Sequence, residues 1–319
     1  MASLFKFDVL RGRRLMRLLT LGSAGTLSLV ACKREIPFDD PSSRMLTVYS
    51  ELNPGKAAWV HVTRSTTLMG EGDPTPVADA LVRWTGEDGT LLATATYVPD
   101  SLPGAWYVAP WMPQEGTQYT LEVEVPANDE LATARVSVPT SAANVRVDSL
   151  FTVEPDPNDW FPVRRSTYEL AFDDDGTSGV FVVRAFLHNR NATVWPPLDS
   201  NIRVVFSLES QDPLWETNGA IFSRLGTARL ALNADEIPNG ERKVRVEVGH
   251  GDFFGLPNYE IVFAVEKWDA DLYRAVVSQE RVSGAGSFNP FVQPITSFSN
   301  VEGGIGFAGG KARVWVRKQ

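Results

Sequence analysis

The part of the sequence that most resembles a cation site is a run of three aspartates, Asp173 to Asp175, followed by Gly176. Hard cations such as Ca²⁺ take carboxylate oxygens as ligands. Successive side chains of an extended chain point to opposite faces, so three adjacent aspartates do not converge on one ion. The spaced D-x-D-x-D-G loop with a later glutamate is also absent from the sequence. We therefore expect a turn between two strands and predict no metal site.

A glycine-rich segment near the end of the sequence could in principle hold a phosphate. A phosphate-binding loop needs Gly-Lys followed by Ser or Thr and a helix, whereas Gly310-Lys311 is followed by Ala312 and a strand-like run to Val316. The pattern favours a tight loop whose glycines reach positive φ and pass close to another backbone. The alternative is a loop that contacts a partner, with these candidate residues: Asn289, Pro290, Phe291, Asn300, Glu302, Gly303 and Gly304.

Catalytic patterns are missing from the sequence. The three histidines, His61, His188 and His250, form neither the H-x-x-x-H nor the H-E-x-x-H spacing, and no G-x-S-x-G motif occurs. A hydrolase would need an acid–base pair assembled from distant positions. We predict that the protein is not an enzyme and that it uses no cofactor.

Cys32 is the single cysteine and lies at the end of an N-terminal export signal. Five basic residues precede an uncharged run from Leu18 to Ala31, which is the arrangement of a signal peptide. The run is shorter than the roughly 20 residues that a membrane-crossing helix needs. Its end, Leu29-Val30-Ala31-Cys32, resembles the lipobox of bacterial lipoproteins, in which the cysteine takes a diacylglycerol. We expect residues 1–31 to be removed and Cys32 to carry the lipid.

Residues 32–44 are polar and contain two prolines, as expected of a tether. Lys33 follows the cysteine where an aspartate would be the signal for retention in the inner membrane, so we predict the outer membrane and the cell surface. The net charge is −9, and residues 1–31 contribute +4 of it, which leaves about −13 for the remainder. So acidic a surface repels phosphate backbones and anionic headgroups. We predict no nucleic-acid binding and membrane attachment through the lipid alone.

Nine tryptophans are the remaining residues that could bind a ligand, because aromatic rings stack on sugars. Trp59, Trp84 and Trp315 lie in strand-like patterns, and we predict them in the core. Four others lie near prolines in loops, where we expect them to be packing anchors or to contact a ligand: Trp111, Trp160, Trp195 and Trp215. Two serines, Ser101 and Ser149, lie in Asp-Ser-Leu triplets that resemble the O-glycosylation site of Bacteroidota.

The elements that position these residues are short β-strands. Alternating apolar and polar runs separated by turn formers such as Asp88-Gly89 predict an immunoglobulin-like or transthyretin-like β-sandwich over residues 45–140. A polar stretch at 139–144 predicts a domain boundary. Residues 145–319 are then a second β-rich domain with one main helix, Asp269 to Glu280, which has Asp269 as its N-cap and packs on a sheet.

The C-terminal motifs carry a family resemblance. Asn289-Pro290-Phe291-Val292-Gln293-Pro294 and the run Ser299 to Gly309 resemble the closing signature of a Bacteroidota lipoprotein family, domain of unknown function 4249. The resemblance implies an accessory surface lipoprotein, of a kind often encoded beside TonB-dependent outer-membrane transporters. We therefore expect a partner-binding component of such a transporter. The alternative is a stand-alone surface protein that captures glycans or peptides, and a hydrolase is the third option.

Overall fold

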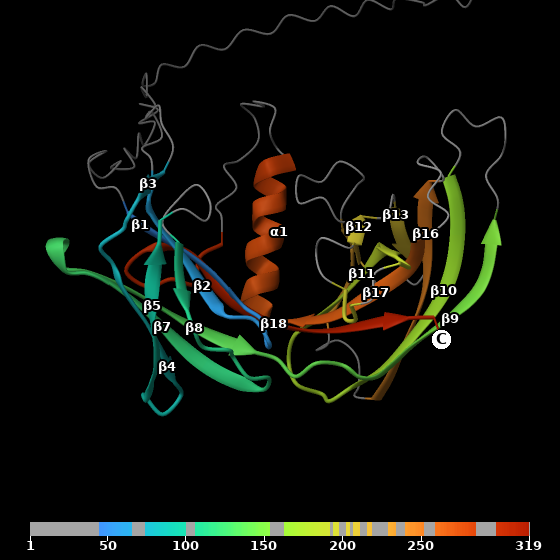
Figure 1. Cartoon of the computed structure of the whole chain (residues 1–319), viewed down its shortest axis with the longest axis horizontal. Helices are drawn as coiled ribbons and strands as arrows, with labels where there is room; N and C mark the ends of the chain where they lie inside the picture. Colours follow the sequence, from blue (N-terminus) through green and yellow to red (C-terminus); the bar gives the residue numbers. More distant parts are fainter. Residues whose placement is uncertain are drawn as a thin grey trace, which may run out of the picture. The chain divides into compact units, whose positions relative to one another are not determined.

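The structure is a computed structural model. It describes residues 45–65, 74–99, 106–153, 163–191, 194–197, 202–204, 207–210, 216–218, 229–233, 240–251, 259–284 and 298–318. All of these belong to one compact unit, residues 42–319. The described chain is mainly β-strand with a single α-helix, which confirms the predicted fold class (Figure 1).

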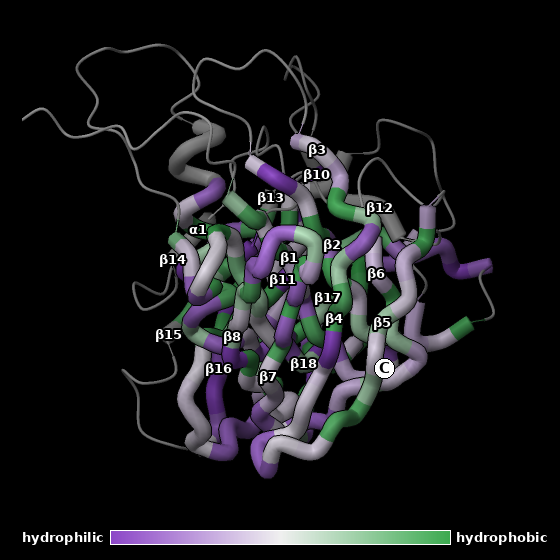
Figure 2. The backbone as a smooth tube through the Cα atoms, turned by 90° about the vertical axis from the view of Figure 1, so that its left-hand side faces the viewer, coloured by the Kyte–Doolittle hydropathy of each residue, from purple (hydrophilic) through white to green (hydrophobic). Residues whose placement is uncertain are grey.

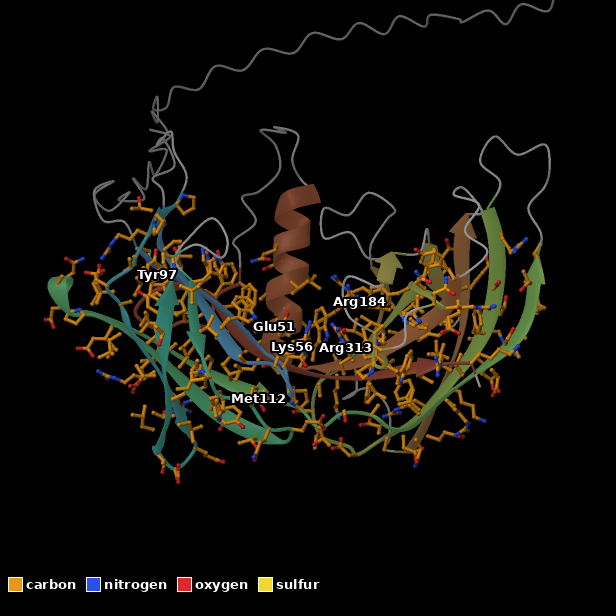
Figure 3. All side chains as sticks on the ribbon, in the orientation of Figure 1. Glu51, Lys56, Tyr97, Met112, Arg184 and Arg313 are labelled. Atoms are coloured by element: carbon orange, nitrogen blue, oxygen red, sulfur yellow. The ribbon has the colours of Figure 1, made fainter. Side chains whose placement is uncertain are left out.

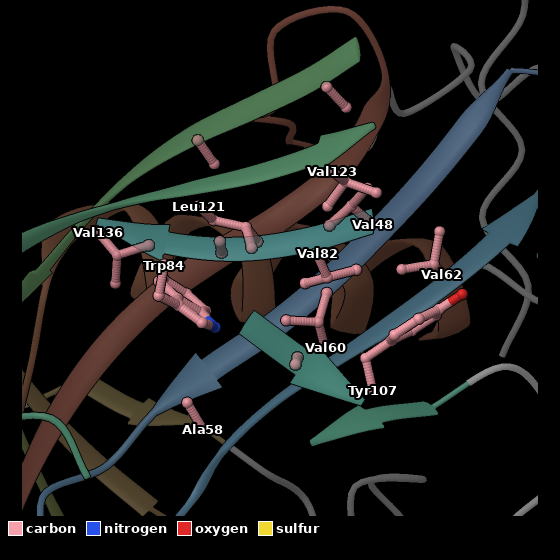
Figure 4. Packing of buried hydrophobic residues seen from close by; sticks show 14 of the residues in the cluster. Val48, Ala58, Val60, Val62, Val82, Trp84, Tyr107, Leu121, Val123 and Val136 are labelled. Carbon is pink, nitrogen blue, oxygen red and sulfur yellow. The ribbon is translucent and has the colours of Figure 1, made fainter. Parts of the chain in front are cut away.

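The strands of the first half form a β-sandwich. Neighbouring strands run in the order β18-β1-β2-β6-β5-β4-β7-β8, so that β4, β7 and β8 lie across a core from β1, β2 and β6. Val48, Val62, Trp84 and Leu121 meet in this core (Figure 4). The strands are β1 (Leu46–Leu52), β2 (Ala58–Arg64), β3 (Thr75–Pro76), β4 (Leu81–Gly86), β5 (Leu91–Val98), β6 (Trp106–Ala109), β7 (Thr117–Val125) and β8 (Glu130–Val138).

The Asp88-Gly89 turn joins β4 to β5, as the sequence predicts. Gly89 has a φ of 78°, a conformation that glycine adopts without steric cost. The Asp88 carboxylate accepts a hydrogen bond from the backbone N–H of Thr90 at 3.0 Å and so closes the turn locally.

The second half also contains two facing sheets. A four-stranded sheet in the order β13-β16-β10-β9 packs against β11, β15 and β17 across a second core. In this core the ring centroids of Phe172 and Phe181 are 4.9 Å apart. The strands are β9 (Ala143–Val153), β10 (Val163–Asp174), β11 (Val180–Asn189), β12 (Ile202–Val204), β13 (Ser207–Ser210), β14 (Glu216–Asn218), β15 (Arg229–Asn233), β16 (Gly240–Gly251) and β17 (Tyr259–Trp268).

The last strand, β18 (Ile305–Arg317), takes part in both halves. It pairs in parallel with β1 and in antiparallel with β17, and so joins their sheets into one. Gly306 has a φ of 117°, and a Cβ atom there would overlap the Val48 carbonyl. The backbone of β18 therefore passes β1 at a distance that only glycine allows, as predicted for this segment. The domain division at 140–145 stays a prediction.

The helix α1 (Ala270–Gly284) stands over β18 (Figure 1). The Asp269 carboxylate accepts a hydrogen bond from the Leu272 N–H at 2.6 Å, which confirms the predicted N-cap. Leu272 is buried against Val180, Val182 and Trp268, so the helix packs on a sheet as predicted. No helix in the described part of the chain has the length and apolar character needed to cross a membrane.

Three strand predictions differ from the structure, although apolar and polar residues alternate along the strands as expected (Figure 2). The sequence pattern predicts one strand from Ile202 to Leu208, but its two ends belong to different sheets, because β12 pairs with β11 whereas β13 pairs with β16. The run Gly249-His250-Gly251-Asp252 predicts a turn, but His250 lies within β16. Strand β9 is not among the strands that the pattern predicts, because its sequence is polar and alternates only weakly.

Candidate binding surface

One face of the joined sheet points away from both cores and carries α1. We call it the α1 face. Because side chains alternate along a strand, Trp59 and His61 of β2 lie here, whereas Val60 and Val62 enter the core. Strand pairing places the following residues on this face, across strands β6, β2, β1, β18, β17 and β11: Trp106, Trp59, His61, Tyr49, Glu51, Phe307, Lys311, Arg313, Trp315, Glu266, Trp268 and Arg184.

Five aromatic residues form a continuous row on the first part of this face, which we call the aromatic ladder: Trp59, Trp106, His61, Tyr49 and Phe307. Ring centroids are 4.9 Å apart for Trp59 and Trp106, and 4.7 Å apart for His61 and Trp106. Tyr49 continues the row, 6.3 Å from His61 and 5.3 Å from Phe307. The rings are half-buried. The prediction that Trp59 is a core residue is thus wrong, since it lies on the opposite face of β2 from the core.

Within the part of the chain that the structure describes, two buried polar atoms of the ladder have no hydrogen-bond partner. They are His61 Nε2 and Trp106 Nε1, and both are shielded from solvent. Burial lowers the pKa of His61 below its usual value of 6.5, so the imidazole is neutral at pH 7. Burial likewise raises the pKa of the Tyr49 phenol. The ladder is therefore an uncharged aromatic surface with unmet hydrogen-bonding capacity.

The second part of the α1 face is a charged network centred on Glu266, whose side chain is fully buried. Its carboxylate accepts hydrogen bonds from Arg313 Nε at 2.5 Å and from Trp268 Nε1 at 2.7 Å, and Arg184 lies 3.6 Å away. Burial alone would raise the pKa of Glu266, but the charges of Lys311, Arg313 and Arg184 outweigh it and lower the pKa to about 2. Glu266 is therefore an anion over the physiological range.

Aromatic rings fix the cations of this network. Arg184 lies 4.9 Å from the Phe186 ring centre and Arg313 lies 5.2 Å from that of Trp315. Lys311 forms an ion pair with Glu51 at 2.7 Å. Glu51, Arg313 and Arg184 surround the foot of α1 (Figure 3). Each of these cations has a carboxylate near it. The buried charges therefore compensate one another, and no bound ligand is needed to neutralise them.

The three aspartates at 173–175 end β10 and lead into a turn, as predicted. Asp174 accepts hydrogen bonds from Arg242 at 2.8 Å and from Lys267 at 3.1 Å. Lys267 also pairs with Asp175 at 2.8 Å. Although burial raises the pKa of Asp174, the two cations outweigh that effect and lower it. Lys267 and Arg242 thus supply the positive charge that a bound cation would supply. Within the described residues, no three His, Cys, Asp or Glu side chains gather as metal ligands.

Asp269 ties α1 to β18. Besides capping the helix, its carboxylate accepts a hydrogen bond from the Gly310 N–H at 2.7 Å. Burial raises the pKa of Asp269 to about 7, against the lowering effect of its hydrogen bonds from the backbone N–H groups of Leu272 and Gly310. A Cβ atom on Gly309 would lie 2.6 Å from the Leu272 Cβ. The helix and the strand therefore pack too closely for a side chain at this position.

The closing motif is part of the packing around β18. The Asn300 side chain donates to the Ala308 carbonyl at 2.8 Å and accepts from its N–H at 3.0 Å. Gly303 has a φ of 76° and lies against the Leu131 backbone, which confirms the predicted tight, glycine-dependent loop. Glu302 pairs with Thr133 through the backbone and is exposed. Its role in contacting a partner stays a prediction, and Asn289, Pro290 and Phe291 lie outside the described residues.

The other predicted sites are only partly described. Cys32, Ser101, Trp160 and Trp215 lie outside the described residues. Ser149 is half-buried on β9. Trp84 is fully buried and confirms its prediction, whereas Trp315 is half-buried on the α1 face.

Sequence reasoning missed the Glu266 network, although a signal was present. Strand β17 reads YEIVFAVEKW, and the adjacent Glu266 and Lys267 interrupt an otherwise apolar run. Adjacent charges of opposite sign inside a buried strand must point to opposite faces, and each then needs a partner from a neighbouring strand. The partners, Arg313 and Asp174, are far away in sequence and could not be identified without the pairing of the strands.

Among the strands that the structure describes, β9 lies at an edge of the four-stranded sheet. Near its C-terminal end three large apolar side chains are exposed: Leu150 by 43%, Phe151 by 56% and Val153 by 53%. The pairing with β10 shifts between Ser149 and Phe151, so that Leu150 has no residue opposite it. We call Leu150, Phe151 and Val153 the β9 edge.

Comparison with known proteins identifies a family and no named relative. No curated protein matches the sequence. A family model described as domain of unknown function (DUF4249) matches residues 33–314, which cover nearly the whole chain. The protein therefore belongs to the family of domain of unknown function 4249.

Proposed function

We propose that this protein is a lipid-anchored lipoprotein of the outer membrane that works by binding a partner protein, and that the partner is a TonB-dependent transporter. The β9 edge is the observation that carries the binding role. The N-terminal export signal ending at Cys32 supports the anchor. The family's frequent association with such transporters supports the choice of partner.

The β9 edge has the properties of a strand that receives another strand. An edge strand presents unpaired backbone N–H and C=O groups, and proteins usually protect such edges with charges, prolines or bulges. The irregular pairing at Leu150 is such a bulge, but Leu150 to Val153 contains no charged residue or proline, and three of its four side chains are apolar and exposed. A strand added from a partner would satisfy the backbone groups and bury these side chains.

Co-purification tests the binding role. Full-length protein solubilised in mild detergent is expected to bring down an outer-membrane barrel, because the β9 edge is free to pair. Leu150→Lys with Phe151→Lys should abolish the recovery of the barrel by placing two charges in the contact. Leu131→Lys is a matched control, since Leu131 is 55% exposed on β8, which lies at one end of the 14-stranded sheet. Recovery of all three forms as lone monomers would refute the proposal.

Lipid labelling tests the anchor independently. Cells fed radioactive palmitate should label the wild-type protein and not the Cys32→Ala form, because the thiol of Cys32 is the attachment point. Equal labelling of the two forms, or no labelling of either, would overturn the lipid anchor and leave the β9 edge untouched.

A further inference from the structure

Lys267 of β17 is a buried amine held against two carboxyl groups. Its side chain is 1% exposed, and so is that of Asp174, whose Oδ1 lies 3.1 Å from the Lys267 Nζ. Asp175 Oδ1 lies 2.8 Å from the same nitrogen. The nitrogen also lies 5.0 Å from the centre of the Phe181 ring, in the second core. A potential nucleophile and a potential electrophile are therefore in contact where bulk water does not reach them.

The two carboxyl groups differ in ways that fit two different roles. Asp174 is shielded from solvent, and Arg242 donates a hydrogen bond to its Oδ2 at 2.8 Å. That contact polarises the carboxyl group and would stabilise an oxyanion formed on it. Asp175 is 35% exposed, so it can exchange protons with water. The first group therefore suits attack at its carbon, and the second suits proton transfer.

We propose that Lys267 and Asp174 condense into an isopeptide bond that links β17 to β10 across the second core. The Lys267 ammonium passes a proton to Asp175, and the free amine attacks the Asp174 Cγ. A C–N bond forms and a C–O bond of Asp174 breaks. The leaving oxygen takes two protons from the former ammonium, one of them through Asp175, and departs as water. The step needs no oxidant, reductant or second substrate.

Charge and proximity favour the condensation. Two cations, Lys267 and Arg242, face two carboxylates beforehand, whereas Arg242 and Asp175 carry one charge each afterwards. These four side chains stay neutral in sum, while two buried charges that are costly to desolvate disappear. Groups held in contact react with effective molarities of about 10⁵–10⁸ M. Because the cations lower the pKa of Asp174, proton transfer is the unfavourable part of the step, and Asp175 assists it.

Peptide mapping of the full-length protein tests the bond. Trypsin should release residues 166–184 and 246–274 as one branched peptide, because a linked Lys267 resists cleavage. Its mass should equal the sum of the two linear peptides less one water, about 18 Da. Fragmentation should place the link on Asp174. Recovery of linear peptides only, or a link on Asp175, would overturn the proposal.

Two variants and an internal control sharpen the test. Lys267→Arg keeps the charge and removes the amine, so the branched peptide should disappear. Asp175→Asn should slow the condensation by about 100-fold or more in newly made, pulse-labelled protein. An unchanged rate would refute the role of Asp175. Lys311 is the control, because its carboxylate partner at 2.7 Å, Glu51, is 31% exposed. Trypsin should cleave after Lys311 in every form. The β9 edge takes no part in the reaction, so this result is independent of partner binding.

Discussion

The two faces of strand β2 are formed by alternate residues of one short sequence, but different interactions stabilise them. Val60 and Val62 have no exposed surface and contribute to the core by burial alone. Trp59 and His61, one residue away, form ring contacts with neighbouring strands and keep part of their surface exposed. The core face of β2 therefore depends on volume, whereas its other face depends on ring contacts with the neighbouring strands. The difference shows that alternation identifies two faces but does not say which large residue faces the core.

The largest expected effect comes from comparing two Trp→Ala substitutions, one in the core and one on the α1 face. Trp84→Ala should lower the free energy of unfolding by about 3–5 kcal/mol, because it empties a fully buried site in the N-terminal core. Trp59→Ala on the α1 face should cost about 1–2 kcal/mol, since its ring is only half-buried. Urea unfolding measures both values. Equal losses would mean that the α1 face supports the fold as much as the core does.

The next effect concerns the charged part of the α1 face. Glu266→Gln should destabilise the protein by about 3 kcal/mol, because Arg184 and Arg313 then lose a buried counter-charge. Glu124→Gln is the control, since Glu124 pairs with Arg83 at 2.8 Å on the exposed side of β7 and should cost at most about 1 kcal/mol. A Glu266→Gln protein as stable as the control would contradict the role assigned to the network.

A further effect is a pH dependence with opposite signs for two carboxyl groups. The pKa of Glu266 is about 2 in the folded protein, against 4.5 as its ordinary value, so its contribution is present above pH 4.5 and is lost as the pH falls toward 2. The pKa of Asp269 is about 7, against 3.8, so its contribution is present below about pH 4 and is lost as the pH rises through 7.

Thermal unfolding across pH 2–8 separates the two groups. Glu266→Gln should reduce the fall in melting temperature below pH 4.5. Asp269→Asn should reduce the fall in melting temperature between pH 4 and 7. If either variant keeps the wild-type slope in its own pH window, the environment assigned to that carboxyl group is wrong.

Much of this architecture follows from local rules of the sequence. Asp88-Gly89 predicts its turn, Asp269 predicts the start of α1, and the glycines around Gly303 and Gly306 predict a backbone that passes close to its neighbours. Asp88 and Asp269 accept hydrogen bonds from groups two and three positions away, so local chemistry is sufficient for them. The glycines indicate that a close approach occurs, but the neighbours themselves, Leu131 and Val48, are distant in sequence.

The candidate surfaces depend on long-range pairing and could not be predicted in the same way. Trp59 and Trp106 become neighbours only because β2 pairs with β6, and Glu266 meets Arg313 only because β17 pairs with β18. The β9 edge depends on where a sheet ends, which alternation does not encode. The position of a residue on a strand was predictable, whereas the identity of the strand beside it was not.

Cross-linking in living cells tests the central claim, the binding of a partner at the β9 edge, most directly. A photoreactive phenylalanine analogue placed at Phe151 should form an adduct with the mass of this chain plus an outer-membrane barrel, because the side chain lies where the partner's strand would pair. The same analogue at Leu131 should form none. An adduct at both positions, or at neither, would contradict a specific contact at the β9 edge.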